Sequence, residues 1–550
     1  MLSSPGHPSI VITRDSSIPK AFLPRKRMGG FDYLLKIAIG IGLILILRWV
    51  WKMVNWVWFQ PRKLENQLKK QGLKGNSYRF MYGDLKETFR MRNEARKNPI
   101  PFTHHFFSRV FPFLHQCLNK YGEGFYTWLG PVPVIHITDP ELTREVFTKM
   151  NEFRKPKLNP LIGLLAPGLV SHEGEKWMKH RKLINPAFHM EKLKLMLPAF
   201  GTSVKEMMNK WEKIVLDSSE VDVWPYLTSL SADAISRAAF GSSFEEGRRI
   251  FELLKEQTEL TLRLFQSVYI PGWRYVPTPT NKRMKEMNSE IQKLLKGIID
   301  KRKKAMEAGE PAKDDLLGIL MDSSMKELQR FGSPKQQLGM SYQDMIDECK
   351  LFYFAGQETT SVLLVWTMIL LSKYQDWQTR AREEILATFG DNQPNFDGLQ
   401  HLKIVTMILH EVLRLYPPVV SVNRKVYDHE MKLGNLSVPP GVLVGLSILN
   451  THHDPKIWGD DATEFKPERF SGGIAKATKG NISFFPFGWG PRICIGQNFA
   501  IVEAKMALSM ILQRFSFKLS PSYTHAPTTI VTLKPQHGAH IILTRLQGSE

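Results

Sequence analysis

Long stretches of the chain repeat apolar residues at the three- and four-residue spacing of an amphipathic helix. Shorter runs, rich in β-branched and aromatic residues, have the length and composition of strands. The pattern therefore predicts an α+β protein that is mainly helical with small β-sheets. The expected helices are residues 203–214, 251–265, 282–306, 342–374, 401–416 and 497–515, and the expected strands are 125–129, 132–137, 442–448 and 540–543.

One large domain, residues 60–550, is expected to contain all these elements. Within it, residues 307–341 are polar and carry charges, glycines and prolines, which predicts a solvent-exposed connection. Neither an internal repeat nor a second catalytic domain is indicated.

An apolar segment at residues 31–59 precedes this domain. Its centre, residues 37–47, contains only apolar residues and glycine, and is shorter than the roughly 20 residues of a spanning helix. Flanking charges can snorkel, however, and tryptophans can form an interfacial belt, so the segment is expected to be a membrane anchor helix. A buried core helix is the alternative. A cleaved signal peptide is disfavoured because no small-residue cleavage site follows; the tryptophans are Trp49, Trp51, Trp56 and Trp58.

Basic residues flank the expected anchor on both sides. Residues 25–27, in an N-terminal extension at 1–30, favour one orientation, and the basic residues after the anchor favour a cytosolic main domain. Translation from Met28 would remove the first cluster and leave a single-pass protein with a cytosolic catalytic domain. The basic residues after the anchor's apolar centre are Arg48, Lys52, Arg62, Lys63, Lys69 and Lys70.

The net charge is strongly positive, since 74 lysines and arginines face 53 acidic residues, a formal charge of +21. Such an excess indicates an anionic neighbour. The basic residues are spread along the chain without zinc-finger spacing or a compact basic helix, so we expect a membrane surface or an acidic protein and not nucleic acid. The three cysteines, Cys117, Cys349 and Cys494, form no disulfide framework and no C-x-x-C pair, which favours a reducing compartment.

The most informative string, F-P-F-G-W-G-P-R-I-C-I-G, spans residues 485–496. Gly488 and Gly490 permit backbone angles closed to other residues, and Gly496 permits close approach of a flat ligand. The helix expected from residue 497 places its positive end near the sulfur of Cys494 and would stabilise a thiolate. A lone cysteine is more often a small buried hydrophobic residue, but these neighbours favour metal binding.

The spacing F-x-x-G-x-R-x-C-x-G within this string resembles the haem-binding loop of the cytochromes P-450. The resemblance implies a cytochrome P-450 fold with haem b as cofactor and Cys494 as the axial thiolate ligand of the iron. It also implies that Arg492 pairs with a haem propionate and that Phe487 packs beside the sulfur.

A second motif, A-G-Q-E-T-T, lies at residues 355–360 inside the apolar helix expected at 342–374. Ala355 and Thr359 share a helix face, and the small Ala355 and Gly356 leave room for a ligand. By resemblance, Glu358 and Thr359 stabilise bound dioxygen and relay protons to it. The alternative is a threonine hydroxyl bonded to the carbonyl four residues earlier, beside a solvated glutamate.

Two further motifs strengthen the resemblance. In E-V-L-R, Glu411 and Arg414 can pair at i and i+3, and the resemblance implies that Arg469 of P-E-R-F completes a buried structural trio. In W-x-x-x-R, Trp177 and Arg181 share a helix face. The resemblance assigns these two, together with Arg424, to the haem propionates, because the planar guanidinium matches a carboxylate.

The resemblance covers residues 56–546. Within the family, the chain is similar to the plant enzymes of the secologanin synthase type. It implies a monooxygenase of the endoplasmic reticulum membrane that uses dioxygen and electrons from NADPH, delivered by NADPH–cytochrome P-450 reductase. The implied substrate is a small apolar terpenoid: an iridoid glucoside, a triterpenoid or a gibberellin. The segments expected to line its pocket are residues 102–112, 419–422 and 527–531, with Leu351, Ala355 and Val362; His104 and His105 are interpreted as exposed loop residues.

Two rival functions are compatible with a haem protein. An isomerase or dehydratase of the same fold needs no external electrons, but such relatives tend to lose the acid–threonine pair that Glu358 and Thr359 retain. A haem-binding scaffold without catalysis would show no turnover, and no motif in the sequence indicates a defective site.

Overall fold

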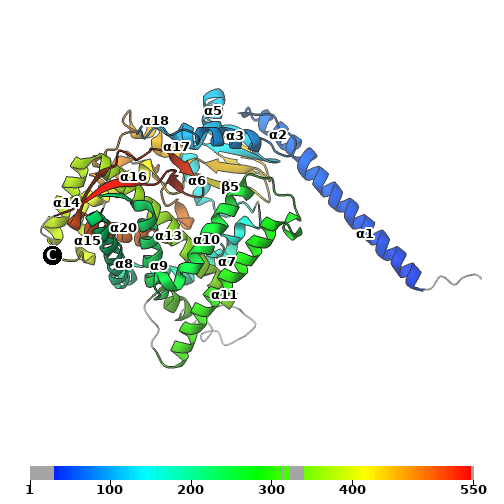
Figure 1. The fold of residues 1–550 in the computed structure, drawn as a ribbon. Helices are drawn as coiled ribbons and strands as arrows, with labels where there is room; N and C mark the ends of the chain where they lie inside the picture. Colours follow the sequence, from blue (N-terminus) through cyan, green and yellow to red (C-terminus); the bar gives the residue numbers. More distant parts are fainter. Residues whose placement is uncertain (1–29, 158, 218, 311–314, 323–339, 547–550) are drawn as a thin grey trace, which may run out of the picture. The chain divides into compact units, whose positions relative to one another are not determined.

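The computed structural model describes residues 30–157, 159–217, 219–310, 315–322 and 340–546 (Figure 1). The chain divides into two compact units, residues 1–55 and 56–550. The extension before residue 30, with the Met28 start site proposed above, lies outside the described residues.

The described part of the first unit is helix α1, Gly30–Val54, which continues into a π-helical turn, Asn55–Phe59. Its leucines, isoleucines and tryptophans are exposed. The helical stretch from Tyr33 onward is long and apolar enough to cross a membrane, and no part of its apolar window is buried. An apolar helix is thus present where the sequence predicts the anchor. The second helix that passes this test, Tyr342–Lys373, is mostly buried and belongs to the core.

The second unit is mainly helical, and each helix expected from periodicity is present. The observed helices are α8 (Met190–Asp217), α10 (Phe244–Phe265), α11 (Pro279–Glu307), α13 (Tyr342–Lys373), α16 (Lys403–Leu415) and α20 (Gln497–Arg514). A capping box starts α13: the Ser341 hydroxyl accepts from the Asp344 N–H, and the Asp344 carboxylate accepts from the Ser341 N–H.

Other helices surround these and carry weaker sequence patterns. They are α2 (Gln60–Lys70), α3 (Leu85–Ala95), α4 (Phe107–Val110), α5 (Pro112–Tyr121), α6 (Pro140–Thr148), α7 (Gly174–Ile184), α9 (Val223–Phe240), α14 (Gln375–Phe389), α15 (Phe396–His401), α17 (Ile448–His453), α18 (Pro455–Trp458) and α19 (Gly473–Ala477).

The largest sheet has the strand order β1-β2-β3-β8-β5. Strands β2 and β3 form an antiparallel hairpin, β3 and β8 are parallel, and β8 and β5 are antiparallel. Its strands are β1 (Lys74–Gly75), β2 (Phe125–Leu129), β3 (Val132–Ile137), β5 (Val422–Lys425) and β8 (Leu443–Leu446). The smaller sheets are β4-β12-β9 (Glu220–Asp222, His540–Arg545, Phe515–Leu519), β6-β7 (Met431–Leu433, Leu436–Val438) and β10-β11 (Pro527–Thr529, Leu533–Pro535).

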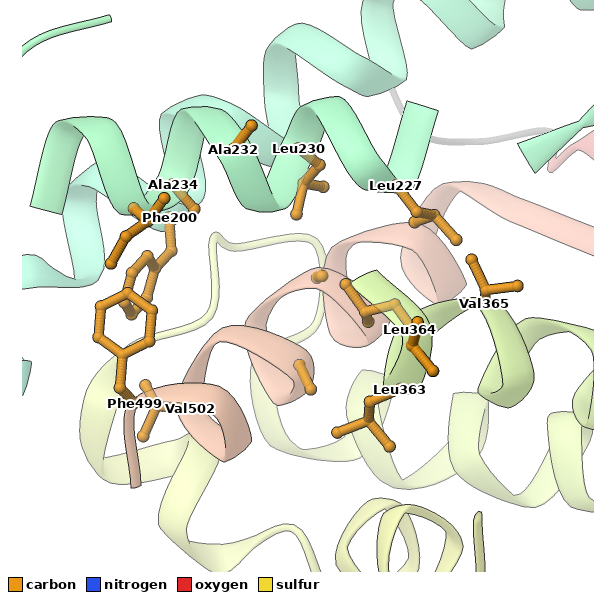
Figure 2. Packing of buried hydrophobic residues seen from close by; sticks show 14 of the residues in the cluster. Phe200, Leu227, Leu230, Ala232, Ala234, Leu363, Leu364, Val365, Phe499 and Val502 are labelled. Carbon is orange, nitrogen blue, oxygen red and sulfur yellow. The ribbon is translucent and has the colours of Figure 1, made fainter. Parts of the chain in front are cut away.

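Helix α13 forms the centre of the core and contacts α9, α16 and α20. Figure 2 shows side chains of α9, α13 and α20 gathered in one hydrophobic cluster. Phe200 of α8 joins it, its ring edge-to-face with Phe499 at 4.9 Å. Gly356 permits the close approach of α13 to α9, because a Cβ at this position would lie 2.8 Å from Ile235 Cγ1.

The connection at residues 307–341 is less exposed than predicted. Residues 316–322 are helical, and four apolar side chains among them are buried in the core: Leu316, Leu317, Leu320 and Met321. Asp315, just before them, pairs with Arg302 at 2.7 Å where both side chains are nearly buried. The prediction was wrong here because this apolar run is too short to show periodicity among its polar neighbours. Residues 311–314 and 323–339 lie outside the described part.

Candidate active site

The loop at residues 485–496 turns back on itself before α20 begins. The Cys494 N–H donates to the Phe487 carbonyl at 2.9 Å, which closes the turn. Gly488 and Gly490 have φ values of 75° and 71°, a region that favours glycine. At Gly490 a Cβ would also lie 2.9 Å from the carbonyl oxygen of Phe147, so only glycine lets the loop lie against α6.

Cys494 lies deep in the domain, yet its side chain is exposed because it faces an internal cavity. Burial raises the pKa of the Cys494 thiol, while the Gly496 N–H and the charge of Arg181 oppose the rise. The Gly496 N–H at the start of α20 and the charge of Arg181 thus both favour the thiolate, in the direction that the sequence predicts, and they act against the effect of burial. A bound metal ion deprotonates a coordinating thiol outright, so ligation would supply the missing stabilisation.

The cavity has a volume of about 470 Å³ and a mostly apolar lining. It is bounded by the cysteine loop, α7, α13 and residues 418–424. Among the expected substrate contacts, Leu351, Ala355, Val419 and Val422 line it. Val362 and the segments 102–112 and 527–531 do not line this cavity.

Cationic side chains gather on one part of the lining, and no carboxylate belongs to the described lining. They are Lys155, Arg181, Arg424 and Arg492. Burial, together with the charge of Arg424, lowers the pKa of Lys155 to about 7, and burial with the charge of Arg492 lowers that of Arg424 to about 10. Both shifts result from burial and from the like charges of neighbouring arginines, and Glu173 opposes both, so an anionic ligand among these cations would be favoured.

The guanidinium groups are oriented by contacts around the cavity. Arg492 pairs with Glu173 at 2.6 Å, donates to the His172 carbonyl at 3.0 Å and lies 4.5 Å from the centre of the Trp177 ring. Arg181 donates to the Ile493 carbonyl at 2.9 Å, next to the cysteine. Trp177 and Arg181 of α7 therefore line the same cavity as Arg492, and their contact with the haem propionates stays a prediction.

On α13, the residues of the A-G-Q-E-T-T motif lie on two different faces of the helix. Ala355, Gly356 and Thr359 line the cavity, and the Thr359 hydroxyl donates to the Ala355 carbonyl at 2.8 Å, as in the alternative stated above. Glu358 does not line the cavity. Its carboxylate accepts from the Thr532 hydroxyl at 2.7 Å and pairs with Lys534 at 2.6 Å.

The structural trio is assembled as expected from its motifs. Arg414 and Glu411 are fully buried and paired at 2.7 Å, and Arg469 lies 3.8 Å from the same carboxylate. Arg414 also donates to the carbonyls of His452 and Ala462, so its guanidinium links α16 to the segment that precedes the cysteine loop.

Several functional neighbours escaped the sequence reasoning. Lys155 belongs to no recognised motif, and only its place on the cavity lining with the three arginines points to a role. Glu348 of α13 accepts from the His180 ring at 2.6 Å and from the Leu169 N–H at 3.0 Å, which ties α13 to the helix that carries Trp177. Such pairs join residues far apart in the sequence and leave no local pattern.

The interpretation of His104 as an exposed loop residue was wrong. Its side chain is 4% exposed, and its ring nitrogens hydrogen-bond to the hydroxyls of Tyr416 at 2.7 Å and Tyr374 at 2.9 Å. Burial lowers the pKa of His104 to about 3, so the ring is a neutral structural element. His105 is exposed, as expected.

A cysteine facing an apolar cavity, with four cationic side chains and no described carboxylate on its lining and a helix crossing the other side, defines a haem-thiolate protein. The chain belongs to the cytochrome P-450 family, whose sequence model (Cytochrome P-450) matches residues 96–541. It is 62% identical over 520 residues to echinocystic acid 23-monooxygenase of Saponaria officinalis, covering 94% of this chain and all of the relative. It is 51% identical over 521 residues to secologanin synthase 1 of Catharanthus roseus, covering 94% and 99%.

The predicted family, the mainly helical cytochrome P-450 fold and the monooxygenase class are thereby confirmed. The enzyme uses haem b and electrons supplied by a reductase. The residues present fit this cofactor, because Cys494 faces the cavity and the cations on its lining match the negative propionates in sign. Bound haem with a thiolate ligand supplies the chemistry that activates dioxygen.

Proposed function

We propose that this monooxygenase oxidises an unactivated carbon of a triterpenoid acid. The observation that carries the proposal is the 62% identity, over the whole of the relative, to an enzyme named for echinocystic acid, a triterpenoid acid. The apolar lining of the cavity suits a hydrocarbon skeleton. Among the three expected terpenoid classes, the triterpenoids are therefore favoured over iridoid glucosides and gibberellins.

Within this proposal, Cys494 is the iron ligand and Phe487 lies beside its sulfur. Arg492, Arg181 and Arg424 hold the propionates, with Trp177 as the platform under Arg492, and Lys155 contributes a further charge. Ala355 and Gly356 are small, so they leave space for the ligand where α13 lines the cavity. The trio of Glu411, Arg414 and Arg469 supports the cysteine loop and takes no part in chemistry.

Thr359 and Glu358 are proposed to supply protons from two different faces of α13, about 100° apart. The Thr359 hydroxyl faces the cavity, where it can donate once it leaves the Ala355 carbonyl. Glu358 is 15% exposed beside Lys534, so it connects with solvent and forms the outer end of the path.

Thr359→Val and Glu358→Gln are each expected to lower product formed per NADPH consumed, on the order of 10- to 100-fold, since a positioned proton donor is lost. The measurement compares NADPH oxidation with product in reconstituted microsomes. Thr367→Val is the matched control, because the Thr367 hydroxyl donates to the Leu363 carbonyl at 2.7 Å on the same helix but does not line the cavity. Equal coupling in all four proteins would contradict the proton role.

The helix at 31–59 is proposed to anchor the enzyme as a single pass in the endoplasmic reticulum membrane, with the domain at 60–550 in the cytosol. The apolar, exposed α1 supports an anchor. The formal charge of +21 suits docking to an acidic face of the reductase. Protease protection of microsomes tests the orientation: the catalytic domain should be digested without detergent.

The substrate proposal is tested with microsomes that contain this chain, the reductase and NADPH. Echinocystic acid, an iridoid glucoside and a gibberellin are supplied separately. A product with one added oxygen from the triterpenoid acid alone is the expected result. Conversion of only the other two classes would overturn the proposal, and product without NADPH would favour an isomerase or dehydratase.

A further inference from the structure

Two histidines and a glutamate converge between α7 and α13, outside the haem cavity. They come from three parts of the chain: His172 lies two residues before α7, His180 lies in the second turn of α7, and Glu348 lies on α13. One nitrogen or oxygen atom of each lies within 4.8 Å of the other two. None of the three side chains lines the cavity, so the proposed haem site leaves them without a function.

The distances between these three atoms suit a small metal ion. Glu348 Oε1 lies 2.6 Å from His180 Nδ1 and 3.9 Å from His172 Nε2. Around a tetrahedral zinc ion with bonds of about 2.1 Å, the ligand atoms lie roughly 3.4 Å from one another. Each of the two observed distances differs from that value by less than about 1 Å, so small rotations of the side chains would accommodate the ion.

A hydrogen-bonded pair of His180 and Glu348 leaves one polar atom of the cluster unexplained. His172 Nε2 is buried and has no hydrogen-bond partner, and the side chain of His172 is only 13% exposed. The His172 ring packs edge-to-face against the His180 ring, with centroids 4.5 Å apart. A buried polar atom without a partner costs free energy. A metal ion bound to His180 and Glu348 would supply the partner that His172 Nε2 lacks.

Neighbouring groups hold the outer atoms of the cluster in the way that is usual for metal ligands. A ligating histidine generally donates its other ring N–H to a carboxylate, and a ligating carboxylate accepts a further hydrogen bond. Here His180 Nε2 lies 3.8 Å from Asp344 Oδ2, and Glu348 Oε2 accepts from the Leu169 N–H at 3.0 Å. Asp344 in turn pairs with Lys176 at 2.6 Å. The two carboxylates thus bring two negative charges, of which Lys176 balances one.

We propose that His172 Nε2, His180 Nδ1 and Glu348 Oε1 bind a zinc ion. Two imidazoles and a carboxylate form a ligand set that zinc accepts readily, whereas magnesium and calcium prefer oxygen ligands alone. Because His172 is partly exposed, water can complete the coordination. The ion joins α13 to α7, the helix that carries Trp177 and Arg181, and takes no part in the oxidation.

The test titrates zinc chloride into the haem-loaded enzyme by isothermal calorimetry, after removal of metal ions with a chelator and without a polyhistidine tag. The wild type is compared with His172→Asn, Glu348→Gln and His189→Asn. His189→Asn is the matched control, because His189 follows the same helix but is exposed and lies outside the cluster. His172→Asn removes a nitrogen that has no hydrogen-bond partner, so it should fold even if Glu348→Gln does not.

The wild type and His189→Asn are expected to bind one tight equivalent of zinc with the same Kd. Loss of a group that only orients a ligand weakens metal binding by about 10- to 100-fold, so loss of the ligand itself in His172→Asn should weaken it by at least roughly 100-fold. Equal affinity of the wild type and His172→Asn would show that zinc binds elsewhere and would overturn the site. A wild type that binds no zinc would overturn it as well, and the proposed function would stand in both cases.

Discussion

Replacing Arg414 with methionine is expected to abolish accumulation of the folded, haem-loaded enzyme. The substitution leaves the Glu411 carboxylate fully buried, with the Lys466 N–H at 3.0 Å and the distant Arg469 as its remaining neighbours. Removing one partner of a buried pair costs about 3–5 kcal/mol, against a typical total stability of about 5–15 kcal/mol. Three carbonyl oxygens would also lose a donor, since Arg414 bonds to those of His452, Ala462 and Glu464.

The measurement is the yield of haem-containing protein and its thermal unfolding. Arg380→Met is the matched control, because Arg380 also pairs with a glutamate, Glu468, at 2.9 Å, but both side chains are exposed. An exposed pair contributes about 0–1 kcal/mol, so the control should retain its yield. Similar losses in the two variants would contradict the structural role of the trio.

The double variant Arg181→Met, Arg424→Met is expected to lose most of its haem. Each side chain would otherwise make a hydrogen bond to a charged propionate, worth about 1.5–3 kcal/mol, so the pair together stabilises bound haem by roughly 3–6 kcal/mol. Because 1.4 kcal/mol is about a tenfold change, haem affinity should fall by at least roughly 100-fold. The measurement is the rate of haem transfer from the enzyme to an apoprotein acceptor.

The control for this variant is Arg248→Met, Arg249→Met. These arginines lie on α10, are about half exposed, and pair with the exposed Glu245 and Glu290. The control should keep its haem, since it removes the same net charge far from the cavity lining. Equal haem loss from both doubles would show that the effect is one of overall charge and not of propionate binding.

The sequence alone predicted those helices and strands whose residues form a clear local pattern. Strands β2 and β3 match their expected bounds because runs of β-branched and aromatic residues follow Gly124 and are separated by a turn at Gly130. Helices α11 and α20 lie close to their expected bounds because apolar residues recur over many turns. The helical piece at 316–322 was missed because one short apolar run carries too little periodicity.

For the site, the motifs located the residues but not the directions of their side chains. Thr359 and Glu358 are adjacent in the sequence, yet successive residues on a helix are about 100° apart, so only Thr359 faces the cavity. Lys155 becomes significant only through its spatial neighbours, the cations that share the cavity lining. The burial of His104 likewise depends on Tyr374 and Tyr416, which are remote in sequence.

Whether Cys494 binds the haem iron is tested by the reduced, carbon-monoxide-bound difference spectrum of the enzyme in microsomes. The spectrum is recorded beside that of Cys494→Ala. If Cys494 is the ligand, the wild type shows a strongly red-shifted Soret band, caused by the thiolate, and the variant lacks it. A haem-loaded, folded wild type without that band, or a variant that keeps it, would show that Cys494 does not bind the iron.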